Sequence, residues 1–199
     1  MNTGAKDFEG YEQTPAPEMS YRRKERLRVK YFKDGNIKSV YLNEQTDVHT
    51  DYGVIPAELV TFYESGALKR LFPRYGAISA YWSDRDEMEF TDYTDLKVGD
   101  RTYHCRPHNL YFREDGSLKS ITIYNCDKLE IPTDYGNIAT NIGISFYPDG
   151  KIESIEPALG TKINLDGKLI RPFNFMADGM HADNNSLKFD RDGKIVSYI

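Results

Sequence analysis

The sequence predicts an all-β fold, an elongated antiparallel meander of repeated β-hairpins with little or no helix. Residues that suit a pleated, half-buried surface dominate, because Val, Ile, Thr, Tyr, Phe and Trp together number 60 of 199 residues while Ala numbers only 10. Hydrophobic residues make up only 39% of the chain, which indicates a thin or extended core. In addition, a short motif recurs around five glycines, and one four-residue segment occurs twice.

The five-fold motif defines five hairpins. Each copy has an aliphatic residue six positions before a glycine, an aromatic residue four before it, and Asp or Ser directly before it; apolar residues follow two and five positions after it. The glycines are Gly35, Gly66, Gly116, Gly150 and Gly193, and the aromatic residues are Tyr31, Phe62, Phe112, Phe146 and Phe189. Asp-Gly or Ser-Gly between two apolar runs is a strong hairpin signal.

The spacing within the motif also predicts the turn. A three-residue loop that ends in glycine places that glycine in the left-handed conformation, where a side chain would be strained. The aromatic residue then faces the aliphatic residue two positions after the glycine, and such a cross-strand pair contributes about 0.2–1 kcal/mol. A two-residue turn would instead place the aromatic residue opposite Lys38, Lys69 or Lys119, so we expect the three-residue loop.

A larger repeat contains the smaller one. Thr50-Asp51-Tyr52-Gly53 recurs as Thr133-Asp134-Tyr135-Gly136, which predicts two tandem halves, about 27–98 and 104–171, followed by a closing hairpin at 186–199. We expect one elongated domain over 27–199, with the acidic segment 82–102 as an irregular join and residues 1–26 as a flexible tail. Isolated hairpins are marginal in water, so the array must continue as one open sheet or fold into two packed sheets.

The motif resembles a known repeat. The unit Val60-Thr-Phe62-Tyr63-Glu-Ser-Gly66-Ala-Leu68-Lys69 and its copies around the other glycines resemble the variant MORN repeat, in particular the bacterial YwqK-type antitoxin components. MORN units normally follow one another at a steady period in the low twenties, whereas the glycines here are 31, 50, 34 and 43 residues apart. The resemblance implies a β-hairpin array that contacts other proteins, and it brings no catalytic residues.

Charge and composition exclude several classes of function. With 26 Lys and Arg against 31 Asp and Glu, the net charge of −5 argues against sequence-independent binding of nucleic acid, and it disfavours attachment to anionic lipid. No apolar stretch is long enough to span a membrane, and the first twenty residues lack the apolar run of a secretory signal. Two cysteines do not form a disulfide framework, so we expect a reducing, cytoplasmic location.

Two histidines and two cysteines form the most chemically suggestive set. His104, Cys105, His108 and Cys126 are of the types that bind zinc, but their spacing fits no common zinc pattern. On one extended strand, His104 and His108 would lie about 13 Å apart while Cys105 pointed the other way, which also argues against a Cys–His catalytic pair. We therefore predict no catalytic residues, no metal and no other cofactor.

The candidate binding residues are of two kinds. Asp84, Asp86 and Glu87 in the acidic join are able to receive a basic partner or a divalent cation, but we expect a solvated, self-repelling loop. Tyr52 and Tyr135 of the duplicated segment are either exposed contact residues or half-buried turn residues.

The sequence as a whole favours a non-enzymatic scaffold that contacts a protein partner, with an antitoxin or immunity-like role implied by the resemblance. The alternative is a small hydrolase or ligand-binding protein with a site between the two β halves, built from the histidines, Cys105 and the acidic join. Neither the identity of a partner or ligand nor the oligomeric state follows from the sequence.

Overall fold

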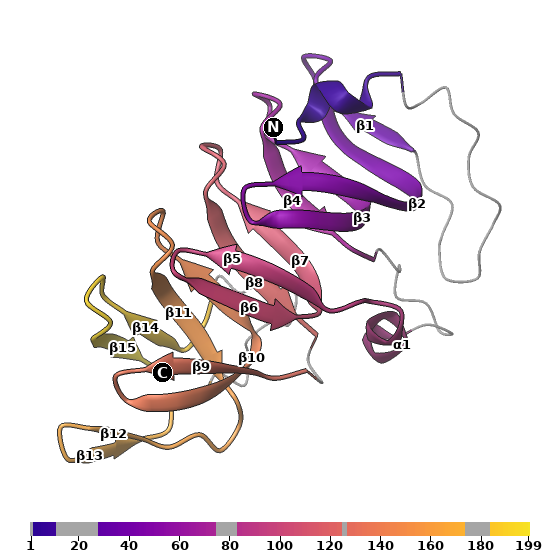
Figure 1. Ribbon diagram of the computed structural model, residues 1–199. Helices are drawn as coiled ribbons and strands as arrows, with labels where there is room; N and C mark the ends of the chain where they lie inside the picture. Colours follow the sequence, from indigo (N-terminus) through magenta and orange to yellow (C-terminus); the bar gives the residue numbers. More distant parts are fainter. Residues whose placement is uncertain (1, 11–27, 75–82, 125–126, 174–183) are drawn as a thin grey trace.

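The computed structural model describes residues 2–10, 28–74, 83–124, 127–173 and 184–199, and it confirms an all-β fold built from successive antiparallel hairpins. An 11-stranded sheet contains most of the strands, and two further hairpins stand apart from it (Figure 1). In the part of the chain that the structure describes, no helix is long and apolar enough to cross a membrane.

Five hairpins, one for each glycine of the motif, form the main sheet in chain order; we call them main hairpins 1 to 5. Their strands are β1 (Val29–Tyr31) and β2 (Ile37–Thr50), β3 (Gly53–Phe62) and β4 (Leu68–Phe72), β7 (Pro107–Phe112) and β8 (Leu118–Ile123), β10 (Gly136–Phe146) and β11 (Ile152–Pro157), and β14 (Leu187–Phe189) and β15 (Ile195–Tyr198). Strand β9 (Leu129–Thr133) pairs with the first part of β10.

The turns have the predicted geometry in all five copies. At Gly116, for example, the glycine N–H donates to the carbonyl of Arg113 at 2.9 Å, and Arg113 N–H donates to the carbonyl of Ser117 at 2.7 Å. The five glycines have φ between +80° and +90°. The aromatic residue faces the aliphatic residue two positions after the glycine in every hairpin, and the pairs are Tyr31–Ile37, Phe62–Leu68, Phe112–Leu118, Phe146–Ile152 and Phe189–Ile195.

Four further hairpins cover one face of the main sheet, and we call them covering hairpins 1 to 4. They are residues 46–57 at the tip of β2 and β3, the pair β5 (Thr94–Val98) and β6 (Arg101–Cys105), residues 129–140 of β9 and β10, and the pair β12 (Ile163–Leu165) and β13 (Lys168–Ile170). Strands β2 and β10 belong to both layers, because their pairing is interrupted between Tyr41 and Thr46 and between Asn141 and Ile144. Figure 1 shows the covering hairpins side by side along the sheet.

The chain therefore alternates between the two layers, and one core lies between them. In the main sheet, the aliphatic residues six before and five after each internal glycine are essentially inaccessible, with exposures of 0–1% for Val60, Leu71, Leu110, Ile121, Ile144 and Ile155. The covering hairpins contribute Val48, Ile55, Leu96, Val98, Ile131, Ile138, Ile163 and Ile170 to the same cluster. The uneven spacing of the glycines follows, because each interval contains a complete covering hairpin and joins of different lengths.

The acidic join differs from the prediction of an irregular segment. It contains a short helix, α1 (Asp84–Glu89), and most of covering hairpin 2, whose second strand continues to Cys105. The alternation of buried Leu96, Val98 and Tyr103 with exposed neighbours around Gly99-Asp100 is the pattern of a half-buried hairpin. With this hairpin counted, the order of hairpins begins to repeat at Pro107, so the division between the halves lies later than residue 98.

The predicted N-terminal tail is wrong for residues 2–10. A 3₁₀ helix, η1 (Ala5–Phe8), places Phe8 at 4% exposure with its ring 5.8 Å from that of Phe62. Thr3 N–H donates to the carbonyl of His49, and Ala5 N–H donates to that of Gly66. An apolar anchor therefore holds this segment on the array, and the remainder of the predicted tail, residues 11–26, lies outside the described residues.

The turn geometry predicts unequal effects of alanine at two glycines. Gly116→Ala introduces a side chain at φ +87° with open space around it, so we expect a loss of about 1–2 kcal/mol in the free energy of unfolding from backbone strain alone. Gly150→Ala adds a clash, because its Cβ would lie 2.9 Å from Gly99 N, and we expect a larger loss. Urea denaturation measures both variants. Equal losses would contradict the close approach of Gly99 and Gly150.

Candidate functional site

The duplicated Thr-Asp-Tyr-Gly segments form identical turns at the tips of covering hairpins 1 and 3. In each, the threonine hydroxyl accepts a hydrogen bond from the tyrosine N–H and donates to the glycine carbonyl, over 3.2 and 2.8 Å in the first copy and 3.1 and 2.8 Å in the second. The half-buried Tyr52 hydroxyl accepts from Leu118 N–H at 2.8 Å, and that of Tyr135 accepts from Ile195 N–H at 3.2 Å. Both tyrosines fasten the layers together and are not exposed contact residues.

Covering hairpins 1 to 3 and the N-terminal segment each reach the main hairpin two units further along the chain. Tyr52 of covering hairpin 1 lies 6.1 Å from Phe112 of main hairpin 3, and Tyr103 of covering hairpin 2 lies 5.5 Å from Phe146 of main hairpin 4. Phe8 of the N-terminal segment has the equivalent place against Phe62 of main hairpin 2. The aromatic residue of the motif is thus the point at which the two layers interlock.

Neighbouring main hairpins are also joined by side chains. The residue three before the glycine donates to the carbonyl of the motif's aromatic residue in the next hairpin: Tyr63 to Phe112 at 2.9 Å, Arg113 to Phe146, and Tyr147 to Phe189 at 2.8 Å. Burial is the main cause that raises the pKa of the Tyr63 hydroxyl, which keeps it a neutral donor. Tyr63, Arg113 and Tyr147 therefore hold neighbouring hairpins together, and their polar groups are not available to form a reactive site.

The structure does not bring together the described residues of the zinc-binding types, His104, Cys105 and His108. His104 lies on β6 with its side chain 65% exposed and its Nδ1 2.6 Å from Asp95, whereas His108 lies on β7 of the main sheet with its ring edge-on to Phe72 and Tyr124. Cys105 points into the core at 4% exposure, and Cys126 lies outside the described residues. Within the described ranges, no three His, Cys, Asp or Glu side chains are placed to hold a metal ion.

Burial also makes Cys105 a poor nucleophile. Removal from water, with smaller contributions from Asp127 and Asp95, raises the pKa of its thiol to about 12, so the thiolate is essentially absent at neutral pH. Cys105 packs in the core between the two layers, where it serves as a small apolar residue.

The acidic residues of the join are structural as well. Asp86 closes a capping box at the start of α1, because its Oδ2 accepts from Ser83 N–H at 2.8 Å while Asp86 N–H donates to Ser83 Oγ at 3.3 Å. The Ser83 hydroxyl, which donates to the same Oδ2 at 2.6 Å, is the main cause that lowers the pKa of Asp86, and Ser83 N–H contributes less. Glu87 is buried at 4% exposure, and Asp84 begins the helix. The spacing Ser83-x-x-Asp86 is a readable signal of this helix start.

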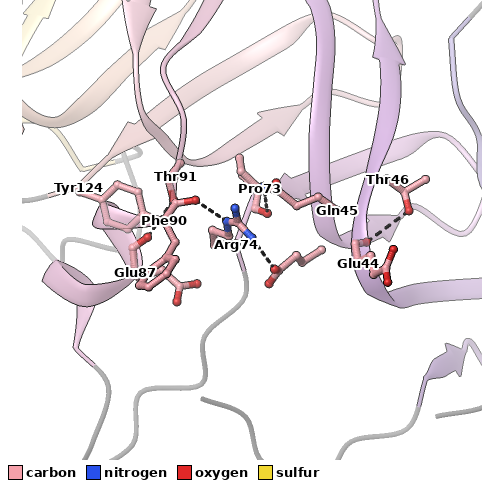
Figure 2. A network of polar contacts seen from close by, with 10 residues as sticks. Glu44, Gln45, Thr46, Pro73, Arg74, Glu87, Phe90, Thr91 and Tyr124 are labelled. Carbon is pink, nitrogen blue, oxygen red and sulfur yellow. Dashed lines mark hydrogen bonds and ion pairs between the residues drawn. The ribbon is translucent and has the colours of Figure 1, made fainter. Parts of the chain in front are cut away.

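A polar cluster secures the join against the main sheet, as Figure 2 shows. Arg74 donates to the buried Glu58 at 3.0 Å and to the carbonyl of Phe90 at 2.7 Å. On the far side of Phe90, Thr91 and Tyr124 share a hydrogen bond of 2.9 Å. The charged groups and hydroxyls of this cluster bind one another, so the cluster holds the join in place and does not form an open site.

Three clefts among the described residues are lined mainly by turns. One of about 860 Å³ lies between the N-terminal segment and the turns of main hairpins 1 and 2, and another of about 590 Å³ lies between the tips of covering hairpins 2 and 3 and the turns of main hairpins 4 and 5. A smaller cleft of about 260 Å³ lies where the two halves adjoin. Their linings contain carboxylates but neither histidine nor cysteine.

The outer face of the main sheet, opposite the covering hairpins, carries a concentration of charge. The residues five before and four after each glycine are cross-strand partners on the face opposite the buried positions of the motif, and the residues three before and three after the glycine flank them, the latter as the extra residue of a β-bulge. Lys30 and Lys38 are exposed, Lys69, Arg70 and Lys119 are half-buried, and Ser120 is buried. In main hairpins 1 to 3 these twelve positions hold six cations, three aromatic residues, three hydroxyls and no acid. They are Lys30, Phe32, Lys38, Ser39, Thr61, Tyr63, Lys69, Arg70, Tyr111, Arg113, Lys119 and Ser120.

Side-chain contacts place these cations on the aromatic rings. Lys38 lies 5.5 Å from the centre of the Phe32 ring and Lys69 lies 5.0 Å from that of Tyr63. Arg70 and Lys119 lie 4.4 and 4.5 Å from that of Tyr111. We call Lys30, Lys38, Lys69, Arg70 and Lys119 the basic row. The basic row is visible when the copies of the motif are aligned in sequence, but only the strand register shows that its residues lie on the same face of the main sheet.

Comparison with known proteins gives no relative: no family model, no curated protein and no solved structure matches the chain. The resemblance to MORN repeats therefore stays a prediction, and the site rests on the geometry alone.

Removal of one tyrosine hydroxyl tests how the layers are fastened. In Tyr52→Phe, Leu118 N–H loses its acceptor, so we expect the free energy of unfolding to fall by about 1–3 kcal/mol. The matched variant Tyr93→Phe changes a ring that is 53% exposed and should have little effect. Urea denaturation compares the two, and an unchanged stability of Tyr52→Phe would contradict the proposed fastening.

Alkylation tests the burial of Cys105. In a Cys126→Ser background, iodoacetamide should modify Cys105 slowly in the folded protein and rapidly in urea, because the folded thiol has a pKa of about 12 against an ordinary 9.0. The folded state then holds the proton more tightly, so the stability contributed by the neutral thiol should be lost as the pH rises from 9.0 towards 12. Rapid modification of the folded protein at pH 8 would show that the thiol is accessible.

Proposed function

We propose that the protein is a non-enzymatic interaction array whose basic outer face binds an acidic segment of a partner protein. The observation that carries this proposal is the composition of the outward positions in main hairpins 1 to 3, with six cations and no acid in a chain whose net charge is −5. Such a segregation of charge favours an acidic partner and speeds its encounter.

The aromatic rings restrict the positions of the cations before a partner binds. A lysine held over a ring within about 6 Å gains roughly 0.5–1 kcal/mol at an exposed site and loses part of its freedom before the partner arrives. The order that this imposes on Lys38 and Lys69 reduces the entropy cost of each new ion pair. The rings also supply apolar surface, and protein interfaces are enriched in aromatic residues but depleted of lysine.

The spacing of the row indicates the form of the acidic segment. Lys38, Lys69 and Lys119 occupy the same motif position in successive hairpins, and each hairpin adds two strands. Their backbone positions therefore recur at about 10 Å, from a strand separation of about 4.8 Å. In the polyproline II conformation a chain has three residues per turn and rises about 3.1 Å per residue, so a segment that crosses the strands with a carboxylate at every third residue presents all of them on one side at close to this spacing.

A protein partner fits better than a nucleic acid. The turns beside the row carry exposed acids, among them Asp34, Glu64, Glu114 and Asp115, and these would repel a continuous phosphate backbone. A carboxylate every third residue places its charges only over the row. A toxin with such an acidic segment, the kind of partner implied by the sequence resemblance, is one example of this class.

Charge reversal tests the row. We expect Lys38→Glu, Lys69→Glu and Lys119→Glu together to weaken binding of a synthetic extended peptide, with glutamate at every third residue, by roughly tenfold or more, since three exposed ion pairs of about 0.5 kcal/mol each amount to about that factor. The matched control reverses Lys97, Lys128 and Lys162, which are exposed on the covering side. Fluorescence anisotropy at fixed ionic strength measures both.

Two outcomes would overturn the proposal. Equal weakening by the control variant would show that only net charge matters, and tighter binding of a single-stranded oligonucleotide than of the peptide would assign the face to nucleic acid. Circular dichroism of each variant confirms that the sheet is intact.

A further inference from the structure

The cleft of about 590 Å³ lies between two walls, and each wall is a covering tip that lies over a main turn. In the first wall, Gly99 of covering hairpin 2 lies against Gly150 of main hairpin 4. In the second wall, Asp134 of covering hairpin 3 lies close to Gly193 of main hairpin 5. These tips and turns lie along the same edge of the array (Figure 1). The volume is within the range of sites for small ligands, which is roughly 300–1,000 Å³.

Side chains join the two walls in both layers. In the covering layer, Arg101 of the first wall donates to the carbonyl of Pro132 in the second at 2.9 Å. In the main layer, Arg191 of the second wall forms an ion pair with Asp149 of the first. Lys151 Nζ also donates to the carbonyl of Arg191 at 2.9 Å. These contacts set the separation of the walls, so the cleft is formed before a ligand arrives.

The two walls carry opposite charge. The first wall has Arg101 and Lys151 against the exposed Asp100, which leaves one positive charge in excess. The second wall has the exposed carboxylates of Asp134 and Asp192. A ligand in the cleft therefore meets positive charge on one side and negative charge on the other.

The remaining charges of the lining are already engaged. Arg191 and Asp149 neutralise each other, and Asp190 Oδ1 accepts from two N–H groups of its own turn at 2.9 Å. Arg101 and Lys151 donate to carbonyls, but guanidinium and ammonium groups have more N–H donors than these contacts use. The groups left for a ligand are therefore donors on the first wall and carboxylates on the second.

Tyr103 adds a buried donor on the side of the positive wall. It is the most buried polar residue of the lining, at 4% exposure, and its ring packs against Phe146. Tyr52 and Tyr135 use their hydroxyls to accept an N–H of a main hairpin, whereas the hydroxyl of Tyr103 lies beside the Arg101 guanidinium. Burial raises the pKa of Tyr103 to about 12, so the hydroxyl keeps its proton at neutral pH.

The equivalent cleft in the first half shows which of these charges the fold requires. This is the cleft of about 260 Å³, between the N-terminal segment over main hairpin 2 and covering hairpin 1 over main hairpin 3. Its second wall is also acidic, with Asp51, Glu114 and Asp115, but neither Lys nor Arg lines it. Directly after the glycine it has Ala67, where the larger cleft has Lys151. The same arrangement of turns therefore forms without a positive wall, so the cations of the larger cleft indicate a role other than folding.

We propose that the larger cleft binds a small zwitterion, either an amino acid or a short peptide. The carboxylate of the ligand lies at Arg101 and Lys151, and its ammonium group lies at Asp134 and Asp192. Hydrogen bonds to ionised partners are about twice as strong as those between neutral groups, so the two walls favour a ligand with both charges over a neutral one. A ligand with a single charge would leave one wall unpaired. This site lies on the turn edge and does not depend on the basic row.

Glycine and its oligomers up to tetraglycine test the charges of the ligand, because they differ only in the separation of their two ends. Each is titrated into the full chain while amide chemical shifts are recorded by nuclear magnetic resonance. We expect one length to shift the amides of Gly99, Gly150 and Gly193 at the lowest concentration, and that length distinguishes a free amino acid from a peptide. Its N-acetyl and C-terminal amide forms each lose one charge and should bind roughly tenfold more weakly. Equal binding of free and blocked forms, or no shift with any length, would overturn the proposal.

Substitutions taken from other copies of the motif test each wall. Lys151→Ala introduces the residue that main hairpin 2 has as Ala67, and Asp192→Ser introduces the one that it has as Ser65, so both turns should fold. Each variant removes one charge that faces the ligand, and we expect roughly tenfold weaker binding of the best oligomer in either.

The matched controls change the same motif positions outside the cleft. They are Lys194→Ala and Asp34→Ser, and both should leave binding unchanged. Controls that weaken binding as much as the wall variants would overturn the proposal. Equal shifts of the Asp51 and Gly116 amides in the smaller cleft would do the same, because that cleft lacks the positive wall. Neither outcome depends on what the basic row binds.

Discussion

The left-handed glycine at each main turn is the constraint on which the rest of the structure depends. It permits a three-residue loop, and that loop sets the aromatic residue of the motif against the aliphatic residue two positions after the glycine in all five hairpins. A slip by one residue would move every side chain to the other face. The same register that buries Phe112 against Tyr52 therefore turns Lys69, Arg70 and Lys119 outward.

The second constraint is that a hairpin cannot bury its apolar face alone. The chain satisfies this constraint because it crosses to the other layer after each main hairpin, and because the two layers are offset by two hairpins. Tyr52, Tyr103 and Phe8 each lie against the aromatic residue of a hairpin that is distant in sequence. The offset ties main hairpins 2 to 5 to elements that precede them in the chain, so that stability is shared along the array although each turn is local.

The sequence predicts the five hairpins, their loop length and their cross-strand pairs because these depend on residues within about ten positions of one glycine. It does not predict the covering layer, since Thr94 to Cys105 lies in a segment whose many acids obscure the alternation of Leu96, Val98 and Tyr103. The prediction of a flexible tail failed at Phe8, because the packing of this one aromatic side chain holds a segment whose composition is otherwise mostly polar. The choice between exposed and half-buried Tyr52 needed a contact 66 residues away, which no local pattern contains. The basic row was present in the motif but was hidden by the net charge of the whole chain.

Lysine footprinting tests the central claim, that the register creates a binding face, most directly. The protein is acetylated at low reagent concentration with and without the peptide that carries glutamate at every third residue, and each site is measured by mass spectrometry. The account predicts that the peptide protects Lys38, Lys69 and Lys119 and leaves Lys97, Lys128 and Lys162 of the covering side unchanged. Protection of the covering side, or equal protection of both sides, would contradict it.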